Sequence, residues 1–209
     1  MNTSPHNLAG LALDAGGVKF DFEKGFPFVS GIQAPIYIDT RRVFFEPAIR
    51  ERAIQGLASR IEQEKLSFDI VAGVESGAIA PAALLASVLG KQFVYVKKKP
   101  KEHGLKRMIE CGDVAGHRVL LIEDMVSTGG SSLNGVQALK DAGASIDTCM
   151  TIHFYDFPGS RENFLQSGIT LHSLILVAEV AHEAASRNII TKEQEDRIIS
   201  WLKKPHEHW

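Results

Sequence analysis

The sequence has few of the residues that build crosslinked or metal-bound folds. Its 209 residues include two cysteines, Cys111 and Cys149, and no histidine or cysteine lies at metal-ligand spacing around either. This argues against both a disulfide framework and a zinc site. An excess of charge of one sign is also missing, since 23 basic and 25 acidic residues give a net charge of −2. Such a balance offers no electrostatic reason to expect nucleic acid or an anionic membrane as a partner.

Long apolar runs are absent as well. No segment is apolar over the length needed to span a bilayer, and the N-terminus lacks the charged region and apolar stretch of a secretory signal. Hydrophobic residues make up 44% of the chain, enough for a sizeable core at this length. We therefore expect a soluble, globular, cytoplasmic protein, most simply one domain, and we find no internal repeat.

The most informative stretch runs from Val119 to Ser132, with the sequence VLLIEDMVSTGGSS. It begins with a short apolar run, Val119–Ile122, which predicts a strand buried on both faces in a parallel sheet. Two adjacent carboxylates follow, Glu123 and Asp124, and then a series of small residues that mostly carry hydroxyls. Apolar residues recur at helical spacing from Leu133 to Leu139. The stretch therefore predicts a strand, a small-residue turn and a helix.

A turn of glycine, serine and threonine that opens a helix is suited to hold a phosphate group. Its free N–H groups and hydroxyls donate hydrogen bonds, the helix dipole favours an anion, and glycines allow close approach. The turn is not a P-loop, because no Gly-Lys-Ser/Thr follows, and it lacks the Gly-x-Gly-x-x-Gly of a dinucleotide fold. Paired carboxylates beside it suit a phosphorylated sugar, because they can accept hydrogen bonds from its vicinal hydroxyls. The alternative is an ordinary strand–loop–helix unit with an acidic N-cap.

Other short apolar segments alternate with helical patterns along the chain, which is typical of α/β proteins. Near the C-terminus, Thr191 and Gln194 form a capping-box pattern for a last helix. We therefore expect an α/β fold with a mostly parallel sheet flanked by helices. The predicted strands include Phe68–Val74, Gln92–Val96, Ile146–Tyr155 and Leu171–Val177. The predicted helices include Glu46–Glu62, which is amphipathic, and one from about Ile79 to Leu89.

Two loops carry further candidate residues. The loop after the strand Phe68–Val74 holds Ser76 among small residues, and it is either a second anion site or a plain turn. The segment Lys97–Arg107 holds five lysines and a histidine, and Pro100 and Gly104 predict that it is mobile. A charge run is usually a solvated face. Mobile cations that close over a multiply charged leaving group would also stabilise its departure and exclude water.

The segment Phe26–Arg42 contains turn signals at Gly31 and Pro35 and a predicted strand at Ile36–Ile38. Composition alone predicts a hairpin flap here and nothing more.

Taken together, these motifs resemble those of the orotate phosphoribosyltransferases, which have the type I phosphoribosyltransferase fold. The central stretch resembles their signature for phosphoribosyl pyrophosphate (PRPP). The flap resembles the hood segment Ser-Gly-x-x-Ser-Pro-x-Tyr-x-Asp-x-Arg, with Ala34 at the second serine. The basic run resembles the catalytic loop Arg-Lys-x-x-Lys-x-His-Gly, with Lys97 at the arginine. One departure is Phe157, which stands where many relatives have an arginine that contacts the base.

The resemblance implies a single domain over residues 1–209, with a hood formed mainly by about residues 1–42 and a C-terminal helical segment, 174–209, packed on the core. The implied catalytic residues are Lys98, Lys101, His103 and Asp124. The implied PRPP-binding residues are Glu123, Asp124, Ser127, Thr128, Gly129, Gly130, Ser131, Ser132, Lys97, Lys98, Lys101 and Ser76. The implied orotate-binding residues are Tyr37, Ile38, Asp39, Arg41, Thr128 and Arg161.

The implied reaction converts orotate and PRPP into orotidine 5′-monophosphate and pyrophosphate. Mg²⁺ is the implied cofactor, carried by the pyrophosphate with no protein ligand assigned. The resemblance also implies a homodimer in which each basic loop reaches into the partner's site, with no nucleic-acid or membrane partner. Two alternatives remain open. A purine phosphoribosyltransferase shares the sugar-phosphate motif but not the hood or basic loop, and a non-catalytic regulator of the same fold would sense nucleotides.

Overall fold

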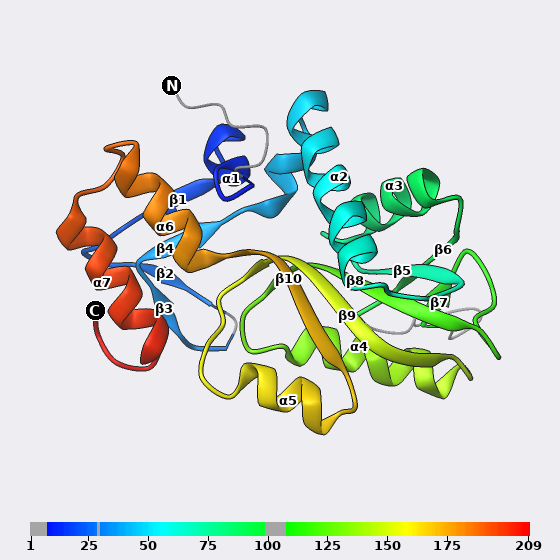
Figure 1. Cartoon of the computed structure of the whole chain (residues 1–209). Coiled ribbons are helices and arrows are strands. Elements are labelled where there is room, and N and C mark those ends of the chain that lie inside the picture. Colours follow the sequence, from blue (N-terminus) through cyan, green and yellow to red (C-terminus); the bar gives the residue numbers. More distant parts are fainter. Residues whose placement is uncertain (1–7, 29, 99–107) are drawn as a thin grey trace.

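The computed structural model describes residues 8–28, 30–98 and 108–209. At its centre is a six-stranded sheet with the strand order β10-β9-β8-β5-β6-β7 (Figure 1). All neighbouring strands are parallel except β7, which pairs antiparallel with β6. The strands are β5 (Ile70–Val74), β6 (Gln92–Val96), β7 (Ile109–Glu110), β8 (Arg118–Val126), β9 (Ser145–Phe154) and β10 (Thr170–Leu176).

Helices cover both faces of this sheet. In Figure 1, α2 (Pro47–Gln63) and α3 (Ile79–Leu89) lie on one face, and α4 (Gly130–Asp141) and α5 (Ser160–Gln166) lie on the other. The apolar run of β5 is buried along its whole length, as expected for a strand covered on both sides. The predicted α/β fold with a mostly parallel sheet is confirmed.

Strand β8 is longer than the sequence predicts. It continues through Glu123 and Asp124 to Val126, because β9 goes on pairing with it after β5 has ended. Glu123 lies opposite Thr151 and Met125 lies opposite His153 in this extension. The expectation that the strand stops at the carboxylates was wrong, because a long neighbouring strand satisfies backbone groups that an apolar run alone does not reveal.

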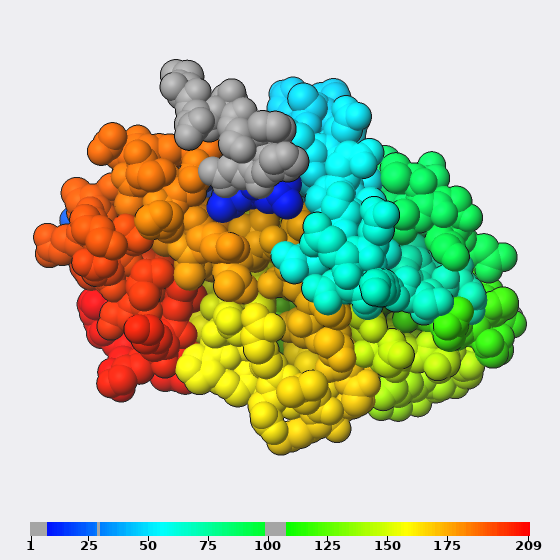
Figure 2. Space-filling view, in the orientation of Figure 1, coloured from blue at the N-terminus to red at the C-terminus, as the bar shows by residue number. Residues whose placement is uncertain are grey.

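A smaller layer is built from the two ends of the described chain. Strand β1 pairs antiparallel with β4, and β2 with β3. The C-terminal helices lie beside these strands, and the space-filling view shows the last residues (red) against the segment that contains α5 (yellow) (Figure 1 and Figure 2). The elements of this layer are α1 (Leu11–Asp14), β1 (Val18–Phe20), β2 (Phe26–Pro27), β3 (Gln33–Ala34), β4 (Ile36–Ile38), the 3-10 helix η1 (Thr40–Phe44), α6 (Val177–Ser186) and α7 (Lys192–Lys203).

Aromatic packing and backbone hydrogen bonds join the two ends. Trp201 of α7 meets the ring of Phe28 edge-on, with 6.5 Å between centroids. The guanidinium of Arg197 donates to the carbonyl oxygen of Phe22 at 3.1 Å. The capping box predicted for α7 is confirmed, since Thr191 Oγ1 accepts from the N–H of Gln194 and the Gln194 side chain accepts from the N–H of Thr191. In the described part of the chain, none of the helices has the length and apolar character to cross a membrane.

Candidate active site

The small-residue turn connects β8 to α4 at the carboxyl end of the sheet. Gly129 has a φ of +89°, a left-handed conformation that favours glycine, and it stands at the N-cap of α4. Within the described residues no side-chain cap forms at this helix, so its first N–H groups lack the acceptor that a capping side chain would supply. Together with the exposed Thr128, they form an N-terminal cradle of the kind that binds phosphate.

Ser132 is buried and directed toward the acidic pair, unlike the exposed Thr128 of the same turn. Its side chain is only 1% exposed, and its Oγ donates to Oε2 of Glu123 at 3.0 Å. The hydroxyl of Ser132 therefore supports the neighbouring carboxyl group, and a role in binding PRPP would have to come from its backbone N–H.

The two acidic residues sit in unequal surroundings. Glu123 is 4% exposed, and its Oε1 accepts from the N–H of Asp124 at 3.2 Å. Burial, followed by the neighbouring Asp124 carboxylate, raises the pKa of Glu123 to about 8. Asp124 is half-buried and lies against Gly77, where a side chain would meet its carboxylate. The protonated form of Glu123 is therefore favoured at neutral pH, and Asp124 is the more accessible of the two acidic side chains.

The loop after β5 brings the second candidate anion site beside this pair. Ser76 is exposed there, and the peptide bond between Glu75 and Ser76 is cis. Gly77 gives the loop its close approach to Asp124, since no Cβ separates the two. The structure thus brings Ser76, Gly77 and the β8 carboxylates together, although they are far apart in the sequence.

The start of the basic run is anchored to this loop. The N–H of Lys98 donates to Oε2 of Glu75 at 3.0 Å, while the Lys98 side chain is exposed. Lys97 is only 6% exposed, and its Nζ lies 2.8 Å from Oε1 of Glu110 on β7. Lys97 was expected to bind PRPP, but its charge is paired inside the protein. Lys101 and His103 lie outside the described residues.

The expected base-binding residues fall into three groups. The side chain of Ile38 is 1% exposed, so it belongs to the core, whereas Tyr37 is half-buried beside the ring of Phe26. Arg41 forms a two-point ion pair with Asp39, with Nε 2.7 Å from Oδ1, and this lowers the pKa of Asp39. The hydrogen bond to Asp39 is also the main reason why the pKa of Arg41 is raised, and charge interaction with Asp124 adds a smaller contribution.

The third group is Arg161 and its surroundings. Its Nε lies 2.8 Å from Oδ1 of Asp156, and its guanidinium stacks over the ring of Phe154. Phe157 is 4% exposed and packs edge-on against Trp201, with 5.2 Å between ring centroids. Phe157, at the position where the family resemblance implied an arginine, is therefore part of an aromatic cluster. Arg161 is paired with Asp156.

Sequence analysis missed two residues that tie the hood to the sheet. His153 of β9 is fully buried, and its Nδ1 lies 2.8 Å from Oγ1 of Thr40. Directly after the end of this strand, the hydroxyl of Tyr155 donates to the carbonyl oxygen of Ile36 at 3.3 Å. Burial lowers the pKa of His153 to about 3, so the ring is neutral. The available signal was a histidine inside the apolar run of β9.

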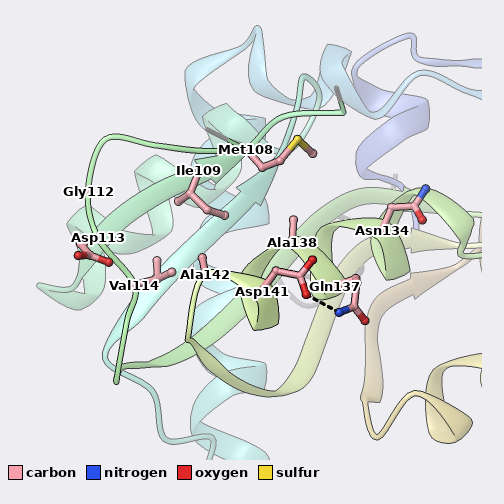
Figure 3. A pocket seen from close by; sticks show the side chains of 10 residues that line it. All are labelled: Met108, Ile109, Gly112, Asp113, Val114, Asn134, Gln137, Ala138, Asp141 and Ala142. Atoms are coloured by element: carbon pink, nitrogen blue, oxygen red, sulfur yellow. Dashed lines mark hydrogen bonds between the residues drawn. The ribbon is translucent and has the colours of Figure 1, made fainter. Parts of the chain in front are cut away.

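One cavity lies away from these groups. It has a volume of about 650 Å³ and lies between α4 and the segment that follows β7 (Figure 3). Gln137 donates to Asp141 at 2.7 Å along its helical wall. Its described lining includes none of the residues expected to bind PRPP or orotate. A second cavity, of about 360 Å³, reaches Thr128 and the end of α7 at Lys203. Thr128 belongs to the turn at residues 127–132 that leads from β8 into α4, and this turn is called the phosphate turn below. In the described residues, histidine, cysteine and carboxylate side chains form no group of three suited to a metal ion.

Comparison with known proteins agrees with this site. Residues 46–176 match the phosphoribosyl transferase domain family. The chain is 34% identical over 202 residues to the orotate phosphoribosyltransferase of Coxiella burnetii, covering 97% of this chain and 96% of the relative. It is also 34% identical over 209 residues to that of Porphyromonas gingivalis, covering 100% and 99%. The crystal structure of orotate phosphoribosyltransferase from Aeropyrum pernix superposes with a TM-score of 0.76 at 26% identity, covering 86% and 98%.

A helix-flanked parallel sheet with a phosphate turn and paired acids at its carboxyl end defines the class of phosphoribosyltransferases. Within that class, the chain belongs to the orotate phosphoribosyltransferase family. The family and fold predicted from the motifs are confirmed.

Proposed function

We propose that this protein transfers the 5-phosphoribosyl group from PRPP to orotate, giving orotidine 5′-monophosphate and pyrophosphate. Two observations support this activity: membership of the family, and the joining of a phosphate turn to an acidic pair at the end of β8. A ring nitrogen of orotate forms the new bond to the anomeric carbon and releases its proton to solvent, and pyrophosphate leaves with the electron pair of the broken bond. The transition state is cationic and ribosyl-like.

Binding the 5′-phosphate and ribose positions the reacting carbon. In our proposal, backbone N–H groups and hydroxyls from Ser127 to Ser132 hold the 5′-phosphate. Asp124 accepts from the ribose hydroxyls, and the protonated Glu123 keeps a second negative charge from crowding that site. Because the phosphate is remote from the bond that breaks, its binding energy is available for orientation.

The leaving group requires positive charge. We assign this role to Lys98, Lys101 and His103, which would close over the pyrophosphate, with Ser76 and the backbone of its loop on the other side. Mg²⁺ bound to the pyrophosphate oxygens would neutralise its charge, in keeping with a metal that takes few protein ligands when phosphates are available. Glu75 within this loop and Asp124 against Gly77 fit as outer contacts.

We further propose a cytoplasmic homodimer in which the basic loop acts in the partner's site. Mixing Lys101→Ala protein with Asp124→Asn protein tests this arrangement. Each hybrid dimer would contain one site with both native residues, so activity should recover in part once subunits exchange. Absence of recovery despite measured exchange would contradict action in trans.

One assay tests the substrate directly. The protein is incubated with PRPP, magnesium and, in turn, orotate, adenine, hypoxanthine, guanine and uracil, and pyrophosphate release is measured. Orotate should be used, and uracil should be rejected strongly, because groups that pair with the orotate carboxylate would be left unpaired. Turnover of a purine without orotate would identify a purine enzyme, and no turnover with any base would favour a regulator.

A further inference from the structure

The cavity of about 360 Å³ lies where three distant parts of the chain meet. Ile32 comes from the hood, Thr128 from the phosphate turn, and Lys203 from the last turn of α7. Figure 1 shows why they meet: the end of α7 lies beside β2 and β3 and above the connection that leads into α5. Its volume is within the range of small-ligand sites, about 300–1,000 Å³.

The inner wall of this cavity is apolar and the rim is charged. Ile32 is 2% exposed and Phe157 is 4% exposed, and Pro205 is also buried. An apolar wall of this kind suits the face of a flat ring, with polar groups at its edge supplying orientation. The polar and charged lining comes from Thr128, from Ser160 and Asn163 of α5, and from Lys203 with the tail that follows it.

The charges at the rim do not cancel. Nζ of Lys204 lies 3.1 Å from Oε2 of Glu207, so these two side chains neutralise each other. Lys203 forms no ion pair with any residue in the described ranges, and it is exposed at the cavity. The remaining charge is therefore positive, and it stands next to an apolar wall that meets the phosphate turn.

The two arginines expected to contact the base are already engaged. Arg41 is paired with Asp39, and Arg161 with Asp156. Releasing either guanidinium toward a substrate would leave a carboxylate without its partner. We propose that Lys203 is the cation that binds the carboxylate of the pyrimidine substrate, whose ring lies in the cavity between Phe157 and Thr128. This assignment rests on the proposed function, because it requires a pyrimidine that carries a carboxylate.

Replacing Lys203 by methionine removes the charge and keeps an unbranched side chain of similar length. With PRPP saturating, KM for orotate should rise roughly ten- to hundredfold, as expected for loss of one charge-assisted hydrogen bond. KM for PRPP should stay within about twofold, because the charge acts on the base alone. Lys203→Arg should restore most of the orotate affinity. Lys192→Met is the matched control, since this lysine is 71% exposed at the other end of the same helix.

Uracil supplies a second readout, because it lacks the carboxylate. Its inhibition constant against orotate should be unchanged in Lys203→Met, whereas equal weakening of uracil and orotate would overturn the proposal. Lysine in a last helical turn also interacts favourably with the helix dipole. If Lys203→Met lowered the melting temperature and left KM for orotate unchanged, Lys203 would act only on the stability of the helix, and the proposal would be overturned. A wild-type protein that turns over no orotate would refute the proposed function itself, and this assignment with it.

Discussion

The hydroxyl of Ser132 donates to the carboxyl group of Glu123 across 3.0 Å, joining the first turn of α4 to strand β8. Both side chains are almost fully buried, at 1% and 4% exposure. This bond holds the phosphate turn and the acidic pair in a fixed relation, so that neither can shift without the other. It also places a carboxyl group where water cannot stabilise its charge.

Glu123 should make stability depend on pH. Because its pKa rises from 4.5 to about 8, the folded protein retains a proton that the unfolded chain releases between these values. Stability from this group is fully present below about pH 4.5 and is lost as the pH rises through about 8. The loss should be on the order of 3–5 kcal/mol. Urea unfolding across this range measures it.

Glutamine at position 123 mimics the protonated acid, so Glu123→Gln should flatten this pH dependence. Glu62→Gln, at an exposed position of α2, should leave it as in the wild type. The difference in unfolding free energy between wild type and Glu123→Gln isolates the contribution of this carboxyl group. If that difference showed Glu123 becoming more stabilising from pH 5 to pH 8, the assigned direction would be wrong.

Gly77 should be required for the position of Asp124. A methyl group at residue 77 would overlap the Asp124 carboxylate and push it from its place. Gly77→Ala should therefore reduce kcat/KM for PRPP about tenfold or more, because small misplacement of a binding group is costly. Stability should change little, since the half-buried carboxylate can move.

Gly112→Ala provides the control for Gly77, because a methyl group there meets its nearest neighbour, a methyl carbon of Val94, at an ordinary 3.5 Å. Its kinetic constants should match the wild type. If Gly77→Ala kept the wild-type kcat/KM for PRPP, the position of Asp124 would not be important for binding the ribose.

The ion pair between Lys97 and Glu110 should respond unequally to loss of either partner. Lys97 is 6% exposed and Glu110 is 29% exposed. Glu110→Ala should cost about 3 kcal/mol of unfolding free energy, because it leaves a buried ammonium unpaired. Lys97→Met should cost less, since Glu110 can still reach water. Urea unfolding measures both values.

Glu64→Gln tests a more exposed pair, with Arg60, and should cost less than about 1 kcal/mol. If Lys97→Met instead raised KM for PRPP and left stability unchanged, Lys97 would be a ligand contact, as the family resemblance implied.

Arginine at position 157, as in many relatives, should not improve this protein. Phe157 is 4% exposed among Tyr155 and Trp201, so Phe157→Arg would place a charge inside an aromatic cluster. We expect a loss of about 3 kcal/mol in unfolding free energy or a displaced C-terminal helix. Leu165→Arg, at a residue of α5 that is 61% exposed, should change stability by less than about 0.5 kcal/mol. A stable Phe157→Arg protein with tighter orotate binding would contradict this view.

Local patterns predicted much of the fold. The strand Gln92–Val96 and the helix Ile79–Leu89 have the predicted bounds, because apolar period and turn residues coincide at their ends. The capping box of α7 was predicted for the same reason, since its partners are three residues apart. Strand β8 was predicted too short because its last residues depend on pairing with β9.

The candidate site divides in the same way. The acidic pair and the phosphate turn with its glycines follow one another directly along the chain. Their order in the sequence is therefore enough to predict a site for a phosphorylated sugar. Lys97, Arg41 and Arg161 carry the charge that the motifs call for, yet each is paired with a carboxylate. The pairing of Lys97 with Glu110, 13 positions away, follows from how β6 and β7 meet. Arg41 and Arg161 instead pair with carboxylates two and five positions away in their own segments.

The sequence by itself therefore determined the family, the sheet and the phosphate turn, because each depends on neighbouring residues. Tertiary structure alone decided which charges remain available and which residues connect the hood to the core. His153 and Thr40 are 113 positions apart, and the end of α7 reaches the phosphate turn only through packing on the hood. Burial and pairing of charges depend on every element around them, and long-range contacts set both.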